Sequence, residues 1–487
     1  MTSKLPFRSR SVELALGLAW ALACGAGCGG SKLVSSDAGA AGKTGSAGAD
    51  GAASDGVDAT LACPVGGTGK LLINTLGLPT GVVPMVRVMG GTLATEMPLT
   101  PGTAVTLDAG NGYVFGWRRV KVAATASALL GKAFYLSSQP WDGCIKKDFT
   151  TMVNLTYSQE PGSEKLWVTV SNSPNAATIG HVIAGFDGAD LVASATKNPT
   201  VWKSDNFTGR GAAGAIDSYG NFWVPGGDRI NQYDMAHLAI STNAPPAVTL
   251  TQPASASAKF AALDASGNLW VSRGGPTTDN AVVRYDASQL GSSGTPTPSV
   301  VIKSSSFMEP AGIAFDDVGD LWVADAGNAK VLMFLAAHLA ASSTAAADIV
   351  LSAGSGSNVA AAFTNPNGLA FDKAKNLWVG FEGVLVMFTP AQQAGSANLM
   401  GPTAPAALML STGTGAFAFD ESGGLWMGGR VSGKVERFPK SQLDTAAAMT
   451  PPTPAADIII DSTAMLGDTE SLVINPSPSW SNLHDDY

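Results

Sequence analysis

The sequence has few charged residues and an acidic balance. Charged side chains make up 14% of its 487 residues, the net charge is −9 and the pI is about 5.0. A protein that binds the phosphates of nucleic acid presents a basic patch, which this composition does not supply. Hydrophobic residues make up 45%, with 57 glycines and 28 prolines, which is typical of a turn-rich β protein. We therefore expect an all-β protein with no nucleic-acid partner, and we predict a monomer.

Metal-binding motifs are also missing from the sequence. Its four histidines form no H-x-x-H or H-x-H pair, and its four cysteines form no C-x-x-C pair. His237 and His338 stand at the same place in an internal repeat, four residues after the aromatic residue that ends a predicted strand. Because a position that recurs in every copy has a structural role in the repeat, we expect both histidines to make local hydrogen bonds.

The N-terminus has no apolar run long enough to cross a bilayer. Residues 14–23 are apolar, follow three basic residues and precede Cys24, as in an export signal. The string WALAC resembles a bacterial lipobox, in which the cysteine is lipidated and becomes the first residue. We predict a lipoprotein signal peptide at 1–23 and lipidation of Cys24, and Cys28 or an ordinary cleaved signal are the alternatives. Gly25 after the anchor favours the outer membrane, and the lipid is the only membrane contact expected in the cell envelope.

The segment after the signal is unsuited to folding. Residues 24–62 consist mainly of Gly, Ala, Ser and Asp and offer almost nothing to bury, so we predict a flexible tether. Cys63 and Cys144 follow it, and export would place them where disulfides persist. We predict a disulfide between them that closes a loop of roughly 80 residues.

Residues 63–160 read as short strands. Apolar and polar side chains alternate between turn-like strings, as in half-buried β-strands. The strings GLPTG, MVRVMGG and LTPG resemble immunoglobulin-like or carboxypeptidase-regulatory-like modules of bacterial surface proteins. This resemblance implies a small Ig-like β-sandwich.

From residue 165 to 475 the chain repeats one phrase of four short apolar runs six times. Each run suits one β-strand, and turn residues separate the runs. The second run carries a tryptophan in every copy, and these tryptophans are 47 to 56 residues apart. That period is close to one four-stranded blade of a β-propeller, and the tryptophans are expected to pack between neighbouring blades. The tryptophans are Trp167, Trp223, Trp270, Trp322, Trp378 and Trp426.

The two ends of the repeat complement each other. The first copy begins with its second run, KLWV at 165–168, and lacks the first run. The final occurrence of the first run, at 471–475, is not followed by a second run. A ring sealed by one C-terminal and three N-terminal strands would leave no open edge between its first and last blades. We therefore predict a six-bladed β-propeller at 164–476, in which 471–475 is the innermost strand of the first blade, and a tail at 477–487.

The repeats resemble a known group of propellers. The phrase PNGLAFD followed by NLWV at 366–379 is similar to the six-bladed propellers of NHL, streptogramin lyase and gluconolactonase type. In gluconolactonase-like enzymes a divalent metal on the axis is held by Glu, Asn and Asp just before the glycine of the first strand. That register contains Lys259, Asn367 and Glu470 here, and Ala or Gly in the other three copies.

Two functions remain open from the sequence. In the first, which the residues favour, the propeller is a non-catalytic binding or protein-interaction module for an unknown protein or small molecule. In the second, the protein is a divergent metal-dependent lactonase or lyase, with a divalent cation such as calcium on the axis. The residues proposed for an axial ligand-binding site are Glu470, Asn367, Glu309, Lys259 and Asp325.

Overall fold

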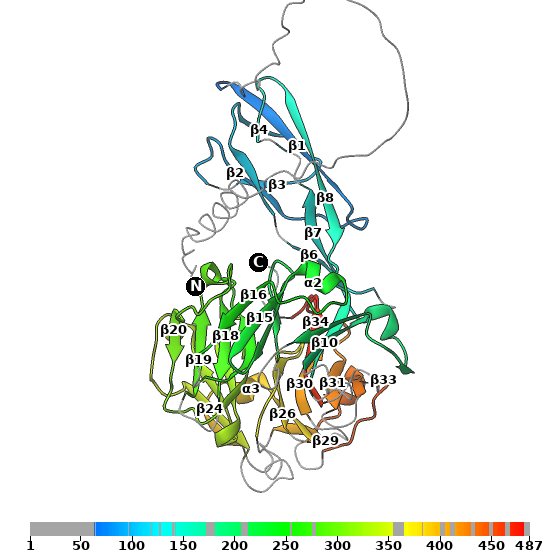
Figure 1. The fold of residues 1–487 in the computed structure, drawn as a ribbon, viewed down its shortest axis with the longest axis vertical. Coiled ribbons are helices and arrows are strands. Elements are labelled where there is room, and N and C mark those ends of the chain that lie inside the picture. Colours follow the sequence, from blue (N-terminus) through cyan, green and yellow to red (C-terminus); the bar gives the residue numbers. More distant parts are fainter. Residues whose placement is uncertain are drawn as a thin grey trace, which may run out of the picture. The chain divides into compact units, whose positions relative to one another are not determined.

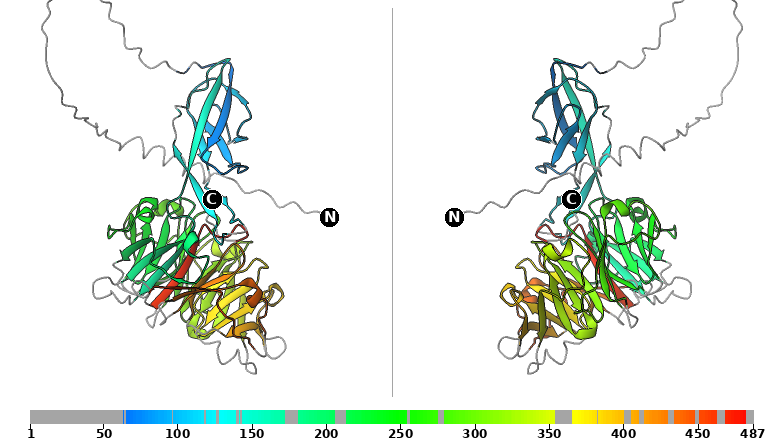
Figure 2. Two further views of the ribbon diagram at one scale, coloured as in Figure 1. Left: turned by 90° about the vertical axis from the view of Figure 1, so that its right-hand side faces the viewer. Right: turned by 90° about the vertical axis from the view of Figure 1, so that its left-hand side faces the viewer.

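The structure is a computed structural model, and strands provide nearly all of its regular structure (Figures 1 and 2). The chain divides into two compact units, one of Met1–Asn74, Val86–Trp117 and Pro140–Asn154, the other of Thr75–Met85, Arg118–Gln139 and Leu155–Tyr487. The predicted signal peptide, Cys24 and the tether lie outside the described residues. The structure describes residues 63, 65–95, 97–117, 119–125, 128–138, 141, 143–171, 181–205, 213–253, 256–274, 279–353, 365–381, 383–399, 405–409, 414–429, 434–447, 451–462 and 468–481.

The first unit contains two small antiparallel sheets. Burial alternates along its strands, so that Leu71, Ile73, Val86 and Val88 are buried and their neighbours face outward. Each sheet therefore buries one face, as a sandwich requires, and the Ig-like topology stays a prediction. The strands are β4 (Val105–Asp108), β1 (Thr68–Leu76) and the first half of β8 (Thr150–Gln159) in one sheet, and β3 (Met97–Leu99), β2 (Val86–Gly90) and β5 (Tyr113–Trp117) in the other. The second half of β8 belongs to the second unit, where it pairs with β7 (Lys132–Ser138), which in turn pairs with β6 (Val120–Val122).

Cys63 and Cys144 are joined by a disulfide within this unit. Their Cα atoms are 5.7 Å apart, although 81 positions separate them in the sequence. The bond ties Cys63 to Cys144, and the next residue, Ile145, pairs through its backbone with Gly110.

Among its described residues, the second unit contains six sheets, each built on four antiparallel strands, and two of these sheets carry a fifth strand that pairs in parallel. Each sheet corresponds to one copy of the repeat, and its strands lie side by side in repeat order. From the inside outward the strands are β34 (Asp468–Asn475), β9 (Lys165–Ser171), β10 (His181–Asp187) and β12 (Val201–Asp205); β13 (Ala215–Ile216), β14 (Phe222–Gly226), β15 (Arg229–Tyr233) and β16 (Val248–Thr251); β17 (Ala258–Leu263), β18 (Leu269–Arg273), β19 (Ala281–Tyr285) and β20 (Val300–Ile302); β21 (Pro310–Phe315), β22 (Leu321–Asp325), β23 (Lys330–Phe334) and β24 (Ile349–Ala353); β25 (Leu369–Phe371), β26 (Leu377–Phe381), β27 (Val384–Phe388) and β29 (Ala406–Met409); and β30 (Thr414–Phe419), β31 (Leu425–Gly429), β32 (Lys434–Phe438) and β33 (Ile458–Asp461).

The last strand completes the first sheet, as the sequence predicts. β34 pairs antiparallel with β9, with Asn475 opposite Lys165 and Leu472 opposite Val168. The innermost strands contact one another in the cyclic order β34, β13, β17, β21, β25, β30 and again β34. The sheets thus form a closed ring, and the C-terminal strand, red in Figure 2, lies within it.

Each repeat tryptophan packs against the next sheet. Trp223 belongs to the apolar cluster of β17 and β18, and Trp426 belongs to that of β9 and β34. Five of the six indoles also donate a hydrogen bond of 2.8 to 3.0 Å to the aspartate six residues earlier, at the end of the innermost strand. The same carboxylates accept backbone N–H groups of the following turn, which fixes the hairpin and the indole together.

The outer edge of each sheet is covered by the next sheet along the chain. A segment between its third and fourth strands lies beside the preceding outermost strand, for example β28 (Ala397–Leu399) beside β24 and β11 (Ala195–Thr196) beside β33. We call these covering segments the outer belt. Five of them contribute a serine whose Oγ accepts the backbone N–H of the covered strand: Ser194, Ser241, Ser293, Ser342 and Ser396.

Short helical turns precede the outer belt, among them α2 (Met235–Ala239), α3 (Pro390–Gln393) and α4 (Lys440–Leu443). Asp234 caps α2 by accepting the backbone N–H of His237 with its side chain. Within the described residues, no helix has the length and apolarity that crossing a membrane demands.

Candidate functional site

The axis of the ring contains a cavity of about 150 Å³. All six innermost strands contribute to its wall, and we call it the axial cavity. Alanines, aliphatic residues and phenylalanines form almost all of its described lining, which contains no ionisable side chain. The lining includes Ala213, Ile216, Phe260, Leu263, Ile313, Phe315, Leu369, Phe371, Phe417, Phe419, Leu472, Val473 and Ile474.

Alanine recurs at one position of the innermost strand, and this position lines the axial cavity. The residue two positions before the closing Asp or Asn is alanine in five strands and Val473 in the sixth, and all six line the cavity. Larger side chains stand on either side of it, such as Phe417 and Phe419 around Ala418. This position is not among the predicted ligand-binding residues, although it recurs in the sequence of every copy. The alanines are Ala215, Ala262, Ala314, Ala370 and Ala418.

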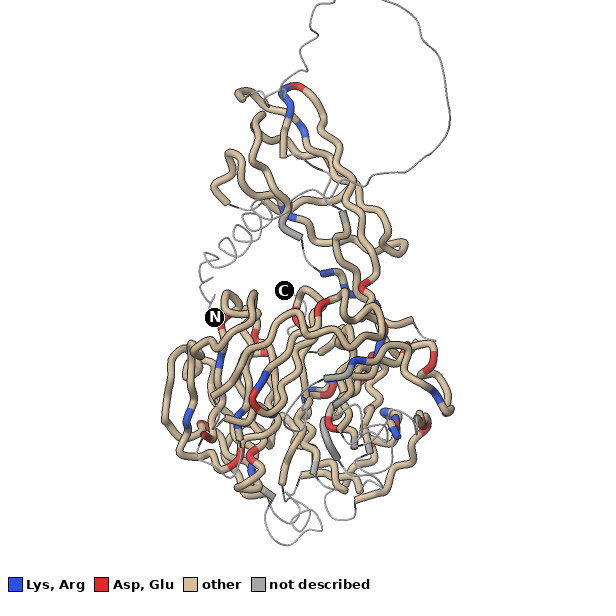
Figure 3. The backbone as a smooth tube through the Cα atoms, viewed as in Figure 1, with Lys and Arg blue, Asp and Glu red and all other residues tan. Residues whose placement is uncertain are grey.

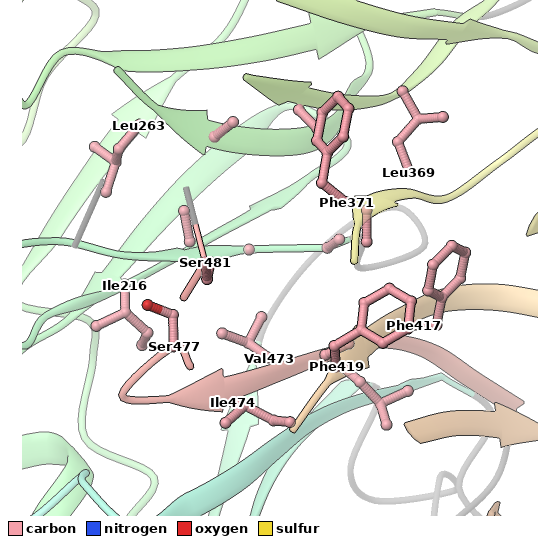
Figure 4. Close-up of a pocket in the computed structure, with 18 of the residues that line it drawn as sticks. Ile216, Leu263, Leu369, Phe371, Phe417, Phe419, Val473, Ile474, Ser477 and Ser481 are labelled. Carbon is pink, nitrogen blue, oxygen red and sulfur yellow. The ribbon is translucent and has the colours of Figure 1, made fainter. Parts of the chain in front are cut away.

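Aromatic rings gather on one side of the axial cavity. Phe371, Phe417 and Phe419 lie together in the close-up, across the cavity from Ile216 and Leu263 (Figure 4). The rings of Phe417 and Phe419 meet edge to face, with centroids 6.3 Å apart. This wall offers both faces and edges of aromatic rings to a guest.

Residues just beyond β34 close part of the axial cavity. Ser477, Pro478, Trp480 and Ser481 contribute to its lining, although the sequence analysis placed them in a tail. The indole of Trp480 donates to the carbonyl of Glu421 at 3.0 Å and meets the ring of Phe419 edge to face at 6.2 Å. The chain after the closing strand is therefore held against the ring.

The predicted axial ligands lie where several innermost strands begin. The pairing is irregular there in β17, β21, β30 and β34, as in a β-bulge, which redirects side chains. Lys259 and Glu309 come together, but as an ion pair with Nζ and Oε1 2.5 Å apart. Glu470 accepts a hydrogen bond of 2.6 Å from the Ser171 hydroxyl.

Asp325 holds a loop in place. Its side chain is fully buried and accepts the backbone N–H groups of Met308 and Glu309 and the amide of Asn328. The backbone of Asn367, by contrast, donates to the carbonyl of Gly380 at 2.9 Å. Among the described residues, no group of three or more His, Cys, Asp or Glu side chains is arranged to hold a metal ion.

The two repeat histidines make the local hydrogen bonds expected of them. His237 contacts the Asp234 carboxylate through Nδ1 at 2.7 Å and the carbonyl of Pro245 through Nε2 at 2.8 Å. His338 contacts the Asp348 carboxylate at 2.9 Å. A third histidine, His181, is the first residue of β10.

Burial shifts the pKa of two ionisable groups of the ring. Burial lowers the pKa of Lys203 to about 8, and the charge of Asp234 opposes this shift. The Lys203 side chain is fully buried and donates to the carbonyl of Ile240. Burial raises the pKa of Asp217, although the hydrogen bonds from Trp223 and Asn221 oppose this shift. Charged residues are otherwise dispersed along the chain (Figure 3).

A buried ion pair, which we call the clamp, joins the chain before the ring to the closing strand. Arg119 donates to both carboxylate oxygens of Glu160 at 2.6 Å, and both side chains are 1% exposed. Arg119 also donates to Asn475, the residue that takes the aspartate position in the first sheet. The indole of Trp167 donates to the carbonyl of Gly162 instead of to an aspartate.

The closed ring of antiparallel sheets defines a β-propeller protein. No family model matches the sequence, and no curated protein matches it. Similar solved structures include a protein of unknown function from Bacteroides caccae, with 11% identity and a TM-score of 0.43 over 64% of this chain and 98% of that chain. A streptogramin B lyase has 12% identity and a TM-score of 0.33 over 73% and 97%. Regucalcin from Agrobacterium tumefaciens, a calcium-binding protein, has 13% identity and a TM-score of 0.35 over 57% and 79%.

Proposed function

We propose that the protein is a lipid-anchored extracytoplasmic binding module whose propeller takes up an apolar group of its ligand in the axial cavity. The observation that supports this is the composition of the cavity wall, to which all six innermost strands contribute alanine, aliphatic and aromatic side chains. Transfer of an apolar group from water into such a cavity is favourable by roughly 25 cal/mol for each Å² buried.

The polar residues near the strand starts support binding over catalysis. Glu309 neutralises Lys259, and Asp325 accepts backbone N–H groups, so both carboxylates serve local structure. The divergent lactonase or lyase is the competing proposal, and a calcium titration of thermal stability separates the two. A bound ion would raise the unfolding temperature by mass action, and Glu470→Ala would remove that increase.

A cavity-filling variant tests the binding function. Ala314→Leu places three more carbon atoms in the axial cavity, whereas Ala374→Leu adds them at an exposed turn residue. We expect apolar probes to stabilise the parent chain and the Ala374→Leu control, and to leave the Ala314→Leu chain unaffected. Equal stabilisation of all three chains by every probe would contradict a function for this cavity.

The anchor has its own test. We expect mass spectrometry of the protein from its native membrane to show a mature chain that begins with a lipidated Cys24. An unmodified amine at that N-terminus would contradict the anchor and leave the binding function standing.

A further inference from the structure

We infer that the axial cavity selects a single uncharged ring, such as a phenyl or phenol group, from among apolar ligands. This inference rests on the proposed binding function and narrows it to one chemical class.

The size of the axial cavity is the first argument. Its volume is about 150 Å³. A protein cavity of about 150 Å³ lined by Leu, Ile and Phe takes up benzene or xenon and stays free of water. The axial cavity has this volume, and Leu, Ile and Phe side chains line it together with alanines, so one six-membered ring fits it. A fused pair of rings adds four carbon atoms to a guest that this volume already accommodates.

The wall chemistry is the second argument. Six aromatic side chains line the axial cavity, and aromatic pairs prefer edge-to-face or offset contacts with centroids 4.5 to 7 Å apart. Phe419 already makes such contacts with Phe417 and with Trp480, at 6.3 and 6.2 Å. A ring guest extends this arrangement, which an aliphatic guest of equal size does not. The six are Phe260, Phe315, Phe371, Phe417, Phe419 and Trp480.

The charge of the guest follows from the same lining. An isolated charge in apolar surroundings is strongly unfavourable unless a partner compensates it, and the described lining has no ionisable side chain. Ser477 and Ser481 lie near Ile216, on the side away from Phe371 (Figure 4), and the Ser477 hydroxyl accepts a hydrogen bond of 2.9 Å from Lys121. One hydroxyl on the guest therefore has polar neighbours, which makes phenol acceptable, and benzoate tests whether Lys121 behind Ser477 compensates a carboxylate.

The test compares benzene, phenol, benzoate, n-octane and naphthalene as probes. The full-length chain with Cys24→Ser and Cys28→Ser needs no detergent, and its unfolding temperature is measured against probe concentration. We expect benzene and phenol to raise it progressively, and naphthalene, octane and benzoate to have at least tenfold weaker effects. Ala314→Leu should abolish the response to benzene, and Ala374→Leu should retain it.

An enlarged cavity provides a second variant. Phe371→Ala removes one ring from the wall, and we expect it to admit naphthalene while it weakens the response to benzene. This exchange of preference does not depend on the stability of the variant, because each probe is compared with the same unliganded chain.

The outcomes separate the two proposals. If octane or naphthalene stabilises the parent chain in an Ala314-dependent manner and benzene does not, the single-ring class is wrong and the binding function stands. If benzoate matches benzene, the requirement for an uncharged guest is wrong. If no probe distinguishes Ala314→Leu from Ala374→Leu, both proposals fail.

Discussion

The clamp allows a quantitative prediction about the energetics of ring closure. Arg119→Met leaves the Glu160 carboxylate buried without its guanidinium partner, and both side chains are 1% exposed in the parent protein. Removal of one partner of a buried ion pair costs about 3 to 5 kcal/mol, because the remaining charge stays desolvated. We expect a loss in this range for Arg119→Met and for Glu160→Met.

The double variant, Arg119→Met with Glu160→Met, is expected to lose much less. Two methionines occupy similar volumes and leave no buried charge, so the main remaining cost is the lost hydrogen bond to Asn475, about 1 to 2 kcal/mol. The coupling energy between the two sites is therefore several kcal/mol. Urea unfolding followed by tryptophan fluorescence measures it, since the tryptophans lie between the sheets.

An exposed ion pair gives the matched control. Lys440 and Asp444 are one helical turn apart, with 2.6 Å between the charged atoms and side chains 52% and 60% exposed. We expect Lys440→Met to cost no more than about 0.5 kcal/mol. A loss for Arg119→Met as small as this, or a double variant as unstable as the sum of the singles, would refute the reasoning.

Three further predictions concern other parts of the protein. Trp378→Phe removes an indole that donates to a half-buried carboxylate, and it should cost about 1.5 to 3 kcal/mol more than its lost packing. Trp167→Phe loses a bond to a carbonyl and should add only about 1 kcal/mol to its packing cost, which urea midpoints of the two variants compare. The pKa of Lys203 is lower in the folded than in the unfolded chain, so the folded chain gives up this proton first as pH rises. Stability should therefore increase by about 3 kcal/mol between pH 8 and pH 10.5, a rise that Lys203→Met removes in a pH series of unfolding curves. Reduction of the Cys63 to Cys144 disulfide should destabilise the first unit by roughly 4 to 5 kcal/mol, which unfolding with and without dithiothreitol measures.

The repeated phrase made most of the ring predictable. Turn residues and tryptophans recur at fixed places, so that the strands, their order and the partner of the last strand follow from the alignment of the copies. The packing of the tryptophans is confirmed, because each of them belongs to an apolar cluster shared with the next sheet. Periodic features of this kind are local in the sequence, which is why a single chain reveals them.

The axial cavity and the clamp were not predicted, for a physical reason. The alternation of Phe417, Ala418 and Phe419 predicts a strand but does not say which side chains leave space around the axis. Arg119 and Asn475 are 356 positions apart, and neither belongs to a motif that marks it. Distances of this kind depend on how the closed ring brings separate segments together. The belt serines were visible in the alignment, four residues after the histidine position, but their acceptor role needed the neighbouring strand.

The outer belt has a consequence for the protein while it is being made. In the first copy of the repeat, Ser194 and β11 pair with β33, and β9 pairs with β34. Both partner strands, β33 and β34, are synthesised last. Until about 300 further residues have emerged, those strand edges remain open to pairing with other chains. Loss of the last copy should therefore produce aggregation of the whole chain, and not a ring that lacks one blade.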